Sequence, residues 1–281
     1  MSFTSALFSL LPMQALVAAL VLITLIGWRG DNAGGRWAQA GMLSLAVGLA
    51  LSSPALGVRL QMPLAAQSLG VAAISAGLSA LWQALGLWLQ PRPGRWAMAA
   101  APLVLAAGHA LLATDRDNAQ TLVDLGLGAQ LAWLGVALTL PGRSHVVQGL
   151  NSRRWRLLGL AAVLPLLVAV LSRAVVTEFG SPSASPDLLL ALAGQLALLL
   201  ALPMLLLAWR GQIEAELARL AQTDGLTGLI DRAAFARRSV DLISMARRFD
   251  EPLALGGLPY WETRGWCWWR WTLPGSWWAC R

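Results

Sequence analysis

Residues 188–209 read LLLALAGQLALLLALPMLLLAW, a stretch without a single charged side chain. About 20 consecutive apolar residues are enough for a helix to cross a bilayer. Six earlier stretches are also predominantly apolar, at 5–28, 37–53, 64–89, 96–114, 121–140 and 156–176. The sequence therefore predicts an all-α membrane bundle of about seven transmembrane helices in residues 1–209, with the lipid bilayer as its solvent.

The composition agrees with a lipid environment. The chain is 57% hydrophobic and 12% charged, whereas soluble domains carry about 25% charged residues. The pI of about 11.2 would suggest nucleic acid as the partner of a soluble protein. Here the arginines lie in short loops between apolar segments, as in polytopic membrane proteins, so nucleic-acid binding is not expected. The two cysteines, Cys267 and Cys280, form no metal-binding pair, and no metal site is predicted.

The arginines also predict an orientation. Alternate loops carry eight of them, and the remaining loops carry only Arg59 and Arg116. The eight are Arg29, Arg36, Arg92, Arg95, Arg143, Arg153, Arg154 and Arg156. By the positive-inside rule these loops face the cytoplasm. We expect a multi-pass protein of the bacterial cytoplasmic (inner) membrane, with its N-terminus outside and its C-terminus in the cytoplasm.

Polar side chains within the apolar stretches are the candidate ligand-binding residues. His109, Asp124 and Arg173 are costly in hydrocarbon, and the predicted topology places them toward the outer ends of three helices. Glu178, Asp115 and Asp117 lie in the adjoining outer loops. One interpretation is an outward-facing pocket for a small polar or ionic ligand. The other is that these groups reach water at the interface and pair with one another.

A short charged segment, 210–222, follows the last apolar stretch. Ile213, Leu217 and Leu220 recur at spacings of four and three, which indicates an apolar seam on a helix continuous with the last span. This seam predicts a signalling linker that pairs two subunits into a homodimer. An ordinary amphipathic helix next to the membrane is the alternative.

The next residues, 224–235, read DGLTGLIDRAAF. This segment resembles the opening D-x-L-T-G-L-x-N-R-x-x-F signature of GGDEF domains, the diguanylate cyclase family. The resemblance covers about 224–255, with Asp231 where the family usually has Asn. The matching positions, all structural in the family, are Asp224, Leu226, Thr227, Gly228, Leu229, Arg232 and Phe235.

The resemblance implies an α/β domain that condenses two GTP molecules into cyclic di-GMP, with Mg²⁺ held by carboxylates and two domains facing each other. The family places those carboxylates after its first strand and in its G-G-[DE]-E-F loop. Neither is found in this chain, where Glu262 is the only carboxylate side chain after Leu255. No catalytic residue, metal ligand or GTP contact is assigned, and we expect the chain as written to be inactive.

The last segment, 256–281, holds seven of the fifteen tryptophans and no helical or strand period. A tryptophan-rich segment for a membrane interface or for stacking on nucleic acid is one interpretation. The other is a shifted reading frame. If Arg270 has a CGN codon, reading Gly265 to Thr272 two bases later gives an apolar run that ends in Asp, as in the family's first strand.

The predicted organisation has four parts: a seven-helix sensory domain (1–209), a signalling linker helix (210–222), the N-terminal fragment of a GGDEF domain (223–255) and an aberrant tail (256–281). The function expected is a membrane-integral signal sensor whose family output is cyclic di-GMP. The alternative is a non-enzymatic receptor-like or carrier protein, although carriers usually show internal repeats.

Overall fold

The computed structural model describes six continuous segments and several short pieces nearer the C-terminus. The segments are 3–27, 32–52, 63–89, 92–140, 150–179 and 185–220, and the pieces are 235, 239–240, 242–244, 247–248, 257–259 and 266–268. The chain divides into two compact units, Met1–Gln212 and Ile213–Arg281. The predicted domain boundary after residue 209 lies close to this division.

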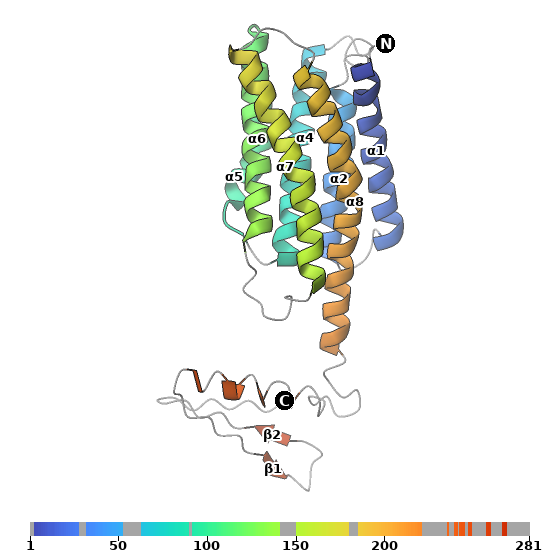
Figure 1. The fold of residues 1–281 in the computed structure, drawn as a ribbon, viewed down its shortest axis with the longest axis vertical. Helices are drawn as coiled ribbons and strands as arrows, with labels where there is room; N and C mark the ends of the chain where they lie inside the picture. The colour runs from blue at the N-terminus through green and yellow to red at the C-terminus, as the bar shows by residue number, and fades with distance from the viewer. Residues whose placement is uncertain are drawn as a thin grey trace. The chain divides into compact units, whose positions relative to one another are not determined.

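Within residues 3–220, the described part of the chain forms long helices that run alternately in opposite directions (Figure 1). They are α1 (Phe3–Ile26), α2 (Ala33–Leu51), α4 (Pro63–Leu89), α5 (Arg95–Leu111), α6 (Arg116–Thr139), α7 (Leu150–Phe179) and α8 (Ser185–Leu220). Each of them overlaps one predicted apolar stretch. The all-helical membrane architecture expected from the sequence is therefore present in this unit.

Five of these helices are long and apolar enough to cross a membrane. Their candidate spans are Thr4–Ile26, Leu64–Leu89, Arg116–Thr139, Arg154–Glu178 and Pro186–Glu214. The other two are α2, with 19 residues, and α5, with 17. The structure supports a helical membrane protein with five candidate spans and does not confirm the predicted number of seven.

Two helices begin earlier than the apolar pattern predicts because polar residues cap them. The side chain of Asn32 accepts a hydrogen bond from the backbone N–H of Gly35 at 2.9 Å, and α2 starts at Ala33. Asp115 accepts from the N–H of Asn118 at 3.2 Å, and α6 starts at Arg116. Such caps satisfy N–H groups of the first turn that have no partner within the helix.

Helices α2 and α4 approach each other backbone to backbone at four glycines. A Cβ atom on Gly48 would lie 2.6 Å from the backbone nitrogen of Ile74 and 2.8 Å from the carbonyl oxygen of Gly70. A Cβ atom on Gly41 would lie 3.0 Å from the carbonyl oxygen of Gly77. Small residues let membrane helices pack this closely. This pair forms the tightest part of the bundle.

Helix α8 is held in a different way. It lies between α1 and α7 in Figure 1, and none of the described helices makes an extensive backbone contact with it. Its attachments are side chains: Gln195 Nε2 donates to the carbonyl oxygen of Leu7 on α1 at 2.8 Å, and Met204 and Leu205 enter the apolar core. Helix α8 is therefore packed less closely against its neighbours than α2 and α4 are against each other.

In the second unit, strands β1 (Gly257–Pro259) and β2 (Trp266–Trp268) pair antiparallel, with Gly257 opposite Trp268. The sequence showed no strand period here, and three-residue strands are too short to display one. Phe235 is helical, and the hydroxyl of Ser239 donates to its carbonyl oxygen at 2.9 Å. Of the predicted GGDEF fragment, 223–255, only residues 235, 239–240, 242–244 and 247–248 are described.

Candidate functional site

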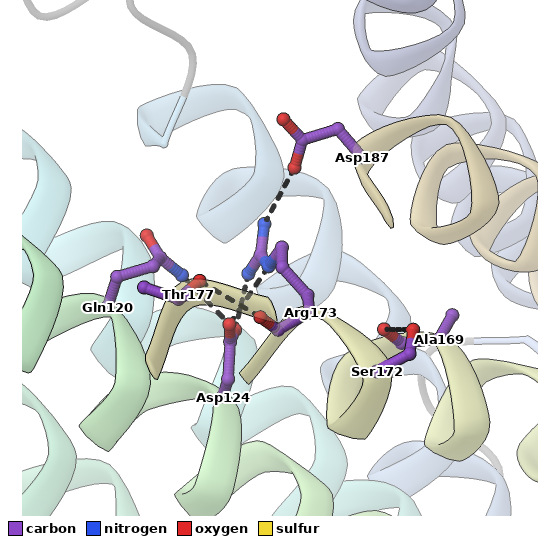
Figure 2. Close-up of polar contacts among 7 residues, drawn as sticks. All are labelled: Gln120, Asp124, Ala169, Ser172, Arg173, Thr177 and Asp187. Atoms are coloured by element: carbon purple, nitrogen blue, oxygen red, sulfur yellow. Dashed lines mark hydrogen bonds and ion pairs between the residues drawn. The ribbon is translucent and has the colours of Figure 1, made fainter. Parts of the chain in front are cut away.

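The strongest polar contact in the bundle joins α6 to α7. Arg173 Nε donates to Asp124 Oδ2 at 2.9 Å, and a second guanidinium nitrogen contacts Asp124 Oδ1 (Figure 2). The side chain of Asp124 is fully buried, whereas that of Arg173 is 22% exposed. A two-point pair of this kind fixes both distance and direction. It compensates a carboxylate that would otherwise be costly inside the bundle.

Two further residues extend this pair. A guanidinium nitrogen of Arg173 lies 3.8 Å from Asp187 Oδ1 on the first turn of α8, and Gln120 Nε2 donates to Asp124 Oδ1 at 3.1 Å. Asp187 is 57% exposed. Figure 2 shows Arg173 between the two carboxylates. The group thus connects α6, α7 and α8 and runs from the interior to the surface.

The charges are divided between the two ends of the bundle. The described carboxylates of residues 3–212 all lie in the half where α5 meets α6 and α7 meets α8, which we call the acidic end. They are Asp115, Asp117, Asp124, Glu178 and Asp187. Arg116 and Arg173 also lie there, and the other described arginines of residues 3–212 lie at the opposite, arginine-rich end. This division follows the loop alternation seen in the sequence.

The structure places the predicted ligand-pocket residues at one end, but only two of them touch. Asp124 and Arg173 are paired, whereas His109 Nδ1 lies 2.9 Å from the hydroxyl of Ser68 on α4. Among the described residues, no hydrogen bond or ion pair joins His109 or Glu178 to the Asp124–Arg173 pair. The tightly connected group is therefore smaller than the predicted pocket.

Sequence reasoning missed two members of this group, Gln120 and Asp187. Asp187 had a recognisable signal, because it follows Pro186 near the start of a helix, and proline and acidic residues favour the first turn. Gln120 lies four residues before Asp124 on α6, a spacing that puts both on one face.

The arrangement allows the guanidinium of Arg173 to exchange one of its carboxylate partners. Asp124 holds Arg173 at two points, while the looser and more exposed Asp187 leaves one edge of the guanidinium accessible from the acidic end. A ligand with a carboxylate or phosphate group would compete with Asp187 for that edge. Within the described residues no group of three or more metal-ligating side chains occurs.

A second polar group is buried closer to the arginine-rich end and has a structural role. Ser75 Oγ donates to Gln130 Oε1 at 2.8 Å, and Gln130 Nε2 donates to Ser79 Oγ at 3.1 Å. Both Ser75 and Gln130 are buried. Since its members satisfy one another across α4 and α6, this group stabilises the bundle and offers no free partner to a ligand.

No family model matches the chain, and no curated protein or solved structure shows a significant similarity to it. The family resemblance at 224–235 therefore rests on that motif alone. Phe235 is helical. The other motif residues, Asp224, Leu226, Thr227, Gly228, Leu229 and Arg232, lie outside the described residues.

Proposed function

We propose that the protein is a membrane-embedded sensor that receives a signal at its acidic end and transmits it through α8. The observation that carries this proposal is a direct link: Arg173 joins the buried Asp124 to Asp187 on the first turn of α8, and α8 continues unbroken to Leu220. At 1.5 Å per residue, the 36 residues of α8 span about 54 Å. A change at Asp187 can therefore act far from its origin.

The two ion pairs of Arg173 differ in strength, so one can break while the other holds. A partly exposed ion pair such as Arg173–Asp187 is worth roughly 0–1 kcal/mol, so a ligand needs only modest differential affinity to displace Asp187. The Asp124–Arg173 pair is buried and bidentate, and it keeps Arg173 in place while Asp187 exchanges. Because α8 is attached by side chains, it can respond without disturbing the glycine contacts of α2 and α4.

The proposed orientation puts the acidic end outside and the end of α8 in the cytoplasm. It is supported by the arginine-rich end, where Arg36, Arg92, Arg95, Arg154, Arg156 and Arg210 lie. Arginine near span ends favours the cytoplasmic side of bacterial inner membranes.

The proposed output follows from the resemblance at 224–235, which begins just beyond Leu220. In an intact family member this output would be cyclic di-GMP made from two GTP with Mg²⁺. A homodimer formed through the linker would bring two output domains together. In the described chain Ile213 and Leu217 are exposed, as a pairing seam requires, while the side chain of Leu220 lies outside the described residues.

The coupling can be tested by cross-linking in native membranes. We would introduce Leu217→Cys into a Cys267→Ser/Cys280→Ser background and measure disulfide formation between subunits. Asp187→Asn should change the yield or rate, because it releases the start of α8. Asp117→Asn, an exposed substitution at the same end, is the matched control and should have no effect. Identical cross-linking in all three proteins would refute transmission through α8.

The output is tested separately at the level of the gene. We would determine the nucleotide sequence from codon 250 to about 450 bases past codon 281, enough for a domain of roughly 150 residues. A shifted frame encoding a metal-binding Asp and a G-G-[DE]-E-F string would support the cyclase output. Closure of every frame without them would leave a receptor-like or carrier protein.

A further inference from the structure

A six-residue motif occurs twice in the bundle, each time at the start of a helix that packs against α4. Residues 35–40 read GRWAQA and lie in the first turns of α2, and residues 94–99 read GRWAMA and span the N-cap and first turn of α5. Their tryptophans, Trp37 and Trp96, are 46% and 84% exposed, and the arginines before them are exposed as well. Each motif thus presents a cation and an indole ring at the surface of the bundle.

Two hydrogen bonds fix how α5 lies along α4. The hydroxyl of Ser79 contacts the carbonyl oxygen of Met98, and the hydroxyl of Ser68 contacts Nδ1 of His109. The two contacts are 11 residues apart on either helix, so α4 and α5 run antiparallel in a constant register. The first residue of α5, three before Met98, therefore lies level with position 82 of α4.

Helix α2 gives the same depth for the other motif. A Cβ atom on Gly41 would lie 3.0 Å both from the carbonyl oxygen of Gly77 and from the side chain of Leu81. Because α2 and α4 are antiparallel, Arg36, five residues before Gly41, lies level with positions 82–86 of α4. Arg36 and Arg95 are thus at one depth, to within about one helical turn. We call this level, with Trp37 and Trp96, the arginine–tryptophan plane.

The distance from this plane to the acidic end matches the apolar thickness of a bilayer. A Cβ atom on Gly108 of α5 would touch Leu122 of α6, so Arg95, 13 residues before Gly108, lies level with position 135 of α6. Asp115, the N-cap of α6, is 20 residues before that position, which corresponds to about 30 Å. The hydrocarbon core of a typical bilayer is also about 30 Å thick.

The side chains at and between these levels suit the same placement. Arginine and tryptophan favour the border of the apolar layer, where their polar ends reach the headgroups. Asp124 lies nine residues along α6 from Asp115, inside the layer, and it is fully buried and paired with Arg173. A charge at that depth is costly without a partner.

Helix α4 is longer than this layer. Its apolar span, Leu64–Leu89, has 26 residues, about 39 Å, and carries no charged side chain. Apolar length alone would place the bilayer over the whole of α4. That placement would draw the exposed Arg95 about 10 Å into hydrocarbon, because position 82 is seven residues before the end of α4.

We propose that the two GRWA motifs anchor the bilayer, so that its apolar layer extends from the arginine–tryptophan plane to the level of Asp115. The arginines reach the lipid headgroups and the tryptophans lie at the border of the layer. The last seven residues of α4, Gln83–Leu89, project about 10 Å beyond it into the headgroup region. This placement holds whichever side of the membrane the acidic end faces, so it is independent of the proposed signalling.

Thiol labelling of the full chain in opened membrane vesicles tests the placement. In a Cys267→Ser/Cys280→Ser background, a charged maleimide reacts only with thiols that contact water. Leu87→Cys, on the projecting part of α4, should react as fast as Asp117→Cys at the acidic end. Leu103→Cys, in the middle of α5, should react only after SDS is added. Leu87 and Leu103 are 53% and 76% exposed, so lipid and not protein packing would make the difference.

A second set of variants tests the anchor itself. Arg36→Leu/Arg95→Leu should lower the labelling rate of Leu87→Cys roughly tenfold or more, because each arginine contributes about 1 kcal/mol at a headgroup surface. Arg36→Lys/Arg95→Lys is the matched control, which keeps both charges and should keep the rate. Leu103→Cys should stay unreactive in both backgrounds, which would show that the bundle is still folded.

Two results would overturn the proposal. If Leu87→Cys is as unreactive as Leu103→Cys, the apolar layer covers the whole of α4. If the leucine double variant leaves the labelling rate of Leu87→Cys unchanged, the two motifs do not position the bilayer.

Discussion

The hydroxyl of Ser79 on α4 lies 2.6 Å from the carbonyl oxygen of Met98 on α5. Met98 is four residues before Pro102, which lies inside α5 and has no N–H to donate to that carbonyl. Ser79 Oγ also lies 2.9 Å from the carbonyl oxygen of Ser75 on its own helix. Since its single proton goes to the shorter contact, Ser79 supplies from a neighbouring helix the hydrogen bond that proline removes. Membrane helices tolerate internal prolines when side chains of neighbouring helices satisfy the freed carbonyls in this way.

Ser79→Ala should destabilise the bundle by about 1–2 kcal/mol, because it removes two interhelical hydrogen bonds, the one to Met98 and the one from Gln130, each worth about 1 kcal/mol in a membrane protein. The cost should shrink in a Pro102→Ala background, because alanine restores the helical donor to Met98. Unfolding of the detergent-solubilised protein by SDS measures both. Ser9→Ala is the control, since Ser9 bonds only within its own helix, to Ala6. Equal costs in the two backgrounds would contradict this coupling.

Asp124→Asn should lower the free energy of unfolding by about 3 kcal/mol. Removing one partner of a buried ion pair costs about 3–5 kcal/mol. The cost should lie at the low end of that range because Arg173 still has Asp187 beside it. Asp187→Asn should cost at most about 1 kcal/mol, since that contact is long and exposed. Thermal unfolding in detergent ranks the two variants. A larger effect at Asp187 would mean that the exposed contact dominates.

Gly48→Ala should destabilise the bundle by roughly 1–3 kcal/mol, as is usual for overpacking, because the added methyl group would meet the backbone of Ile74. Gly86→Ala is the matched control on α4: no atom lies within 4 Å of its added carbon. That variant should gain up to about 1 kcal/mol from helix propensity. The two variants should therefore change the stability in opposite directions. An equal loss of stability in both would rule out backbone contact as the cause.

Membrane-impermeant thiol labelling tests the proposed orientation. In a Cys267→Ser/Cys280→Ser background, Asp117→Cys should react in intact spheroplasts because the acidic end faces outward. Arg95→Cys should react only after the membrane is opened. Both positions are exposed, so accessibility depends on the side of the membrane. The reverse pattern would invert the topology and leave α8 ending outside the cytoplasm.

The sequence was sufficient to locate the helices because apolar length is a local property. The apolar pattern could not decide whether α2 and α5 span the membrane. Helix α2 contains Arg36 and Gln39, and the apolar run of α5 is short. The sequence singled out Asp124 and Arg173 because charge in an apolar stretch is conspicuous. Their pairing, and the participation of Asp187, depend on which helix faces lie together, and that information is not local.

The contacts of Ser79 and Gln130 were missed for the same reason. Serine and glutamine are ordinary residues in apolar helices, and only their positions across α4, α5 and α6 reveal a connected group. The strand pair at Gly257 and Trp268 went unnoticed because its pairing involves only three residues on each side.

The glycines of α2 and α4 bear on how the chain is inserted into the membrane. Gly41 and Gly48 are separated by seven residues, as are Gly70 and Gly77, so each pair recurs after two helical turns. Two contact points along an antiparallel pair prevent one helix from pivoting on the other. We expect α2, which is not among the five candidate spans, to leave the translocon as a hairpin with α4, so that α4 covers the glycine face of α2 during biogenesis.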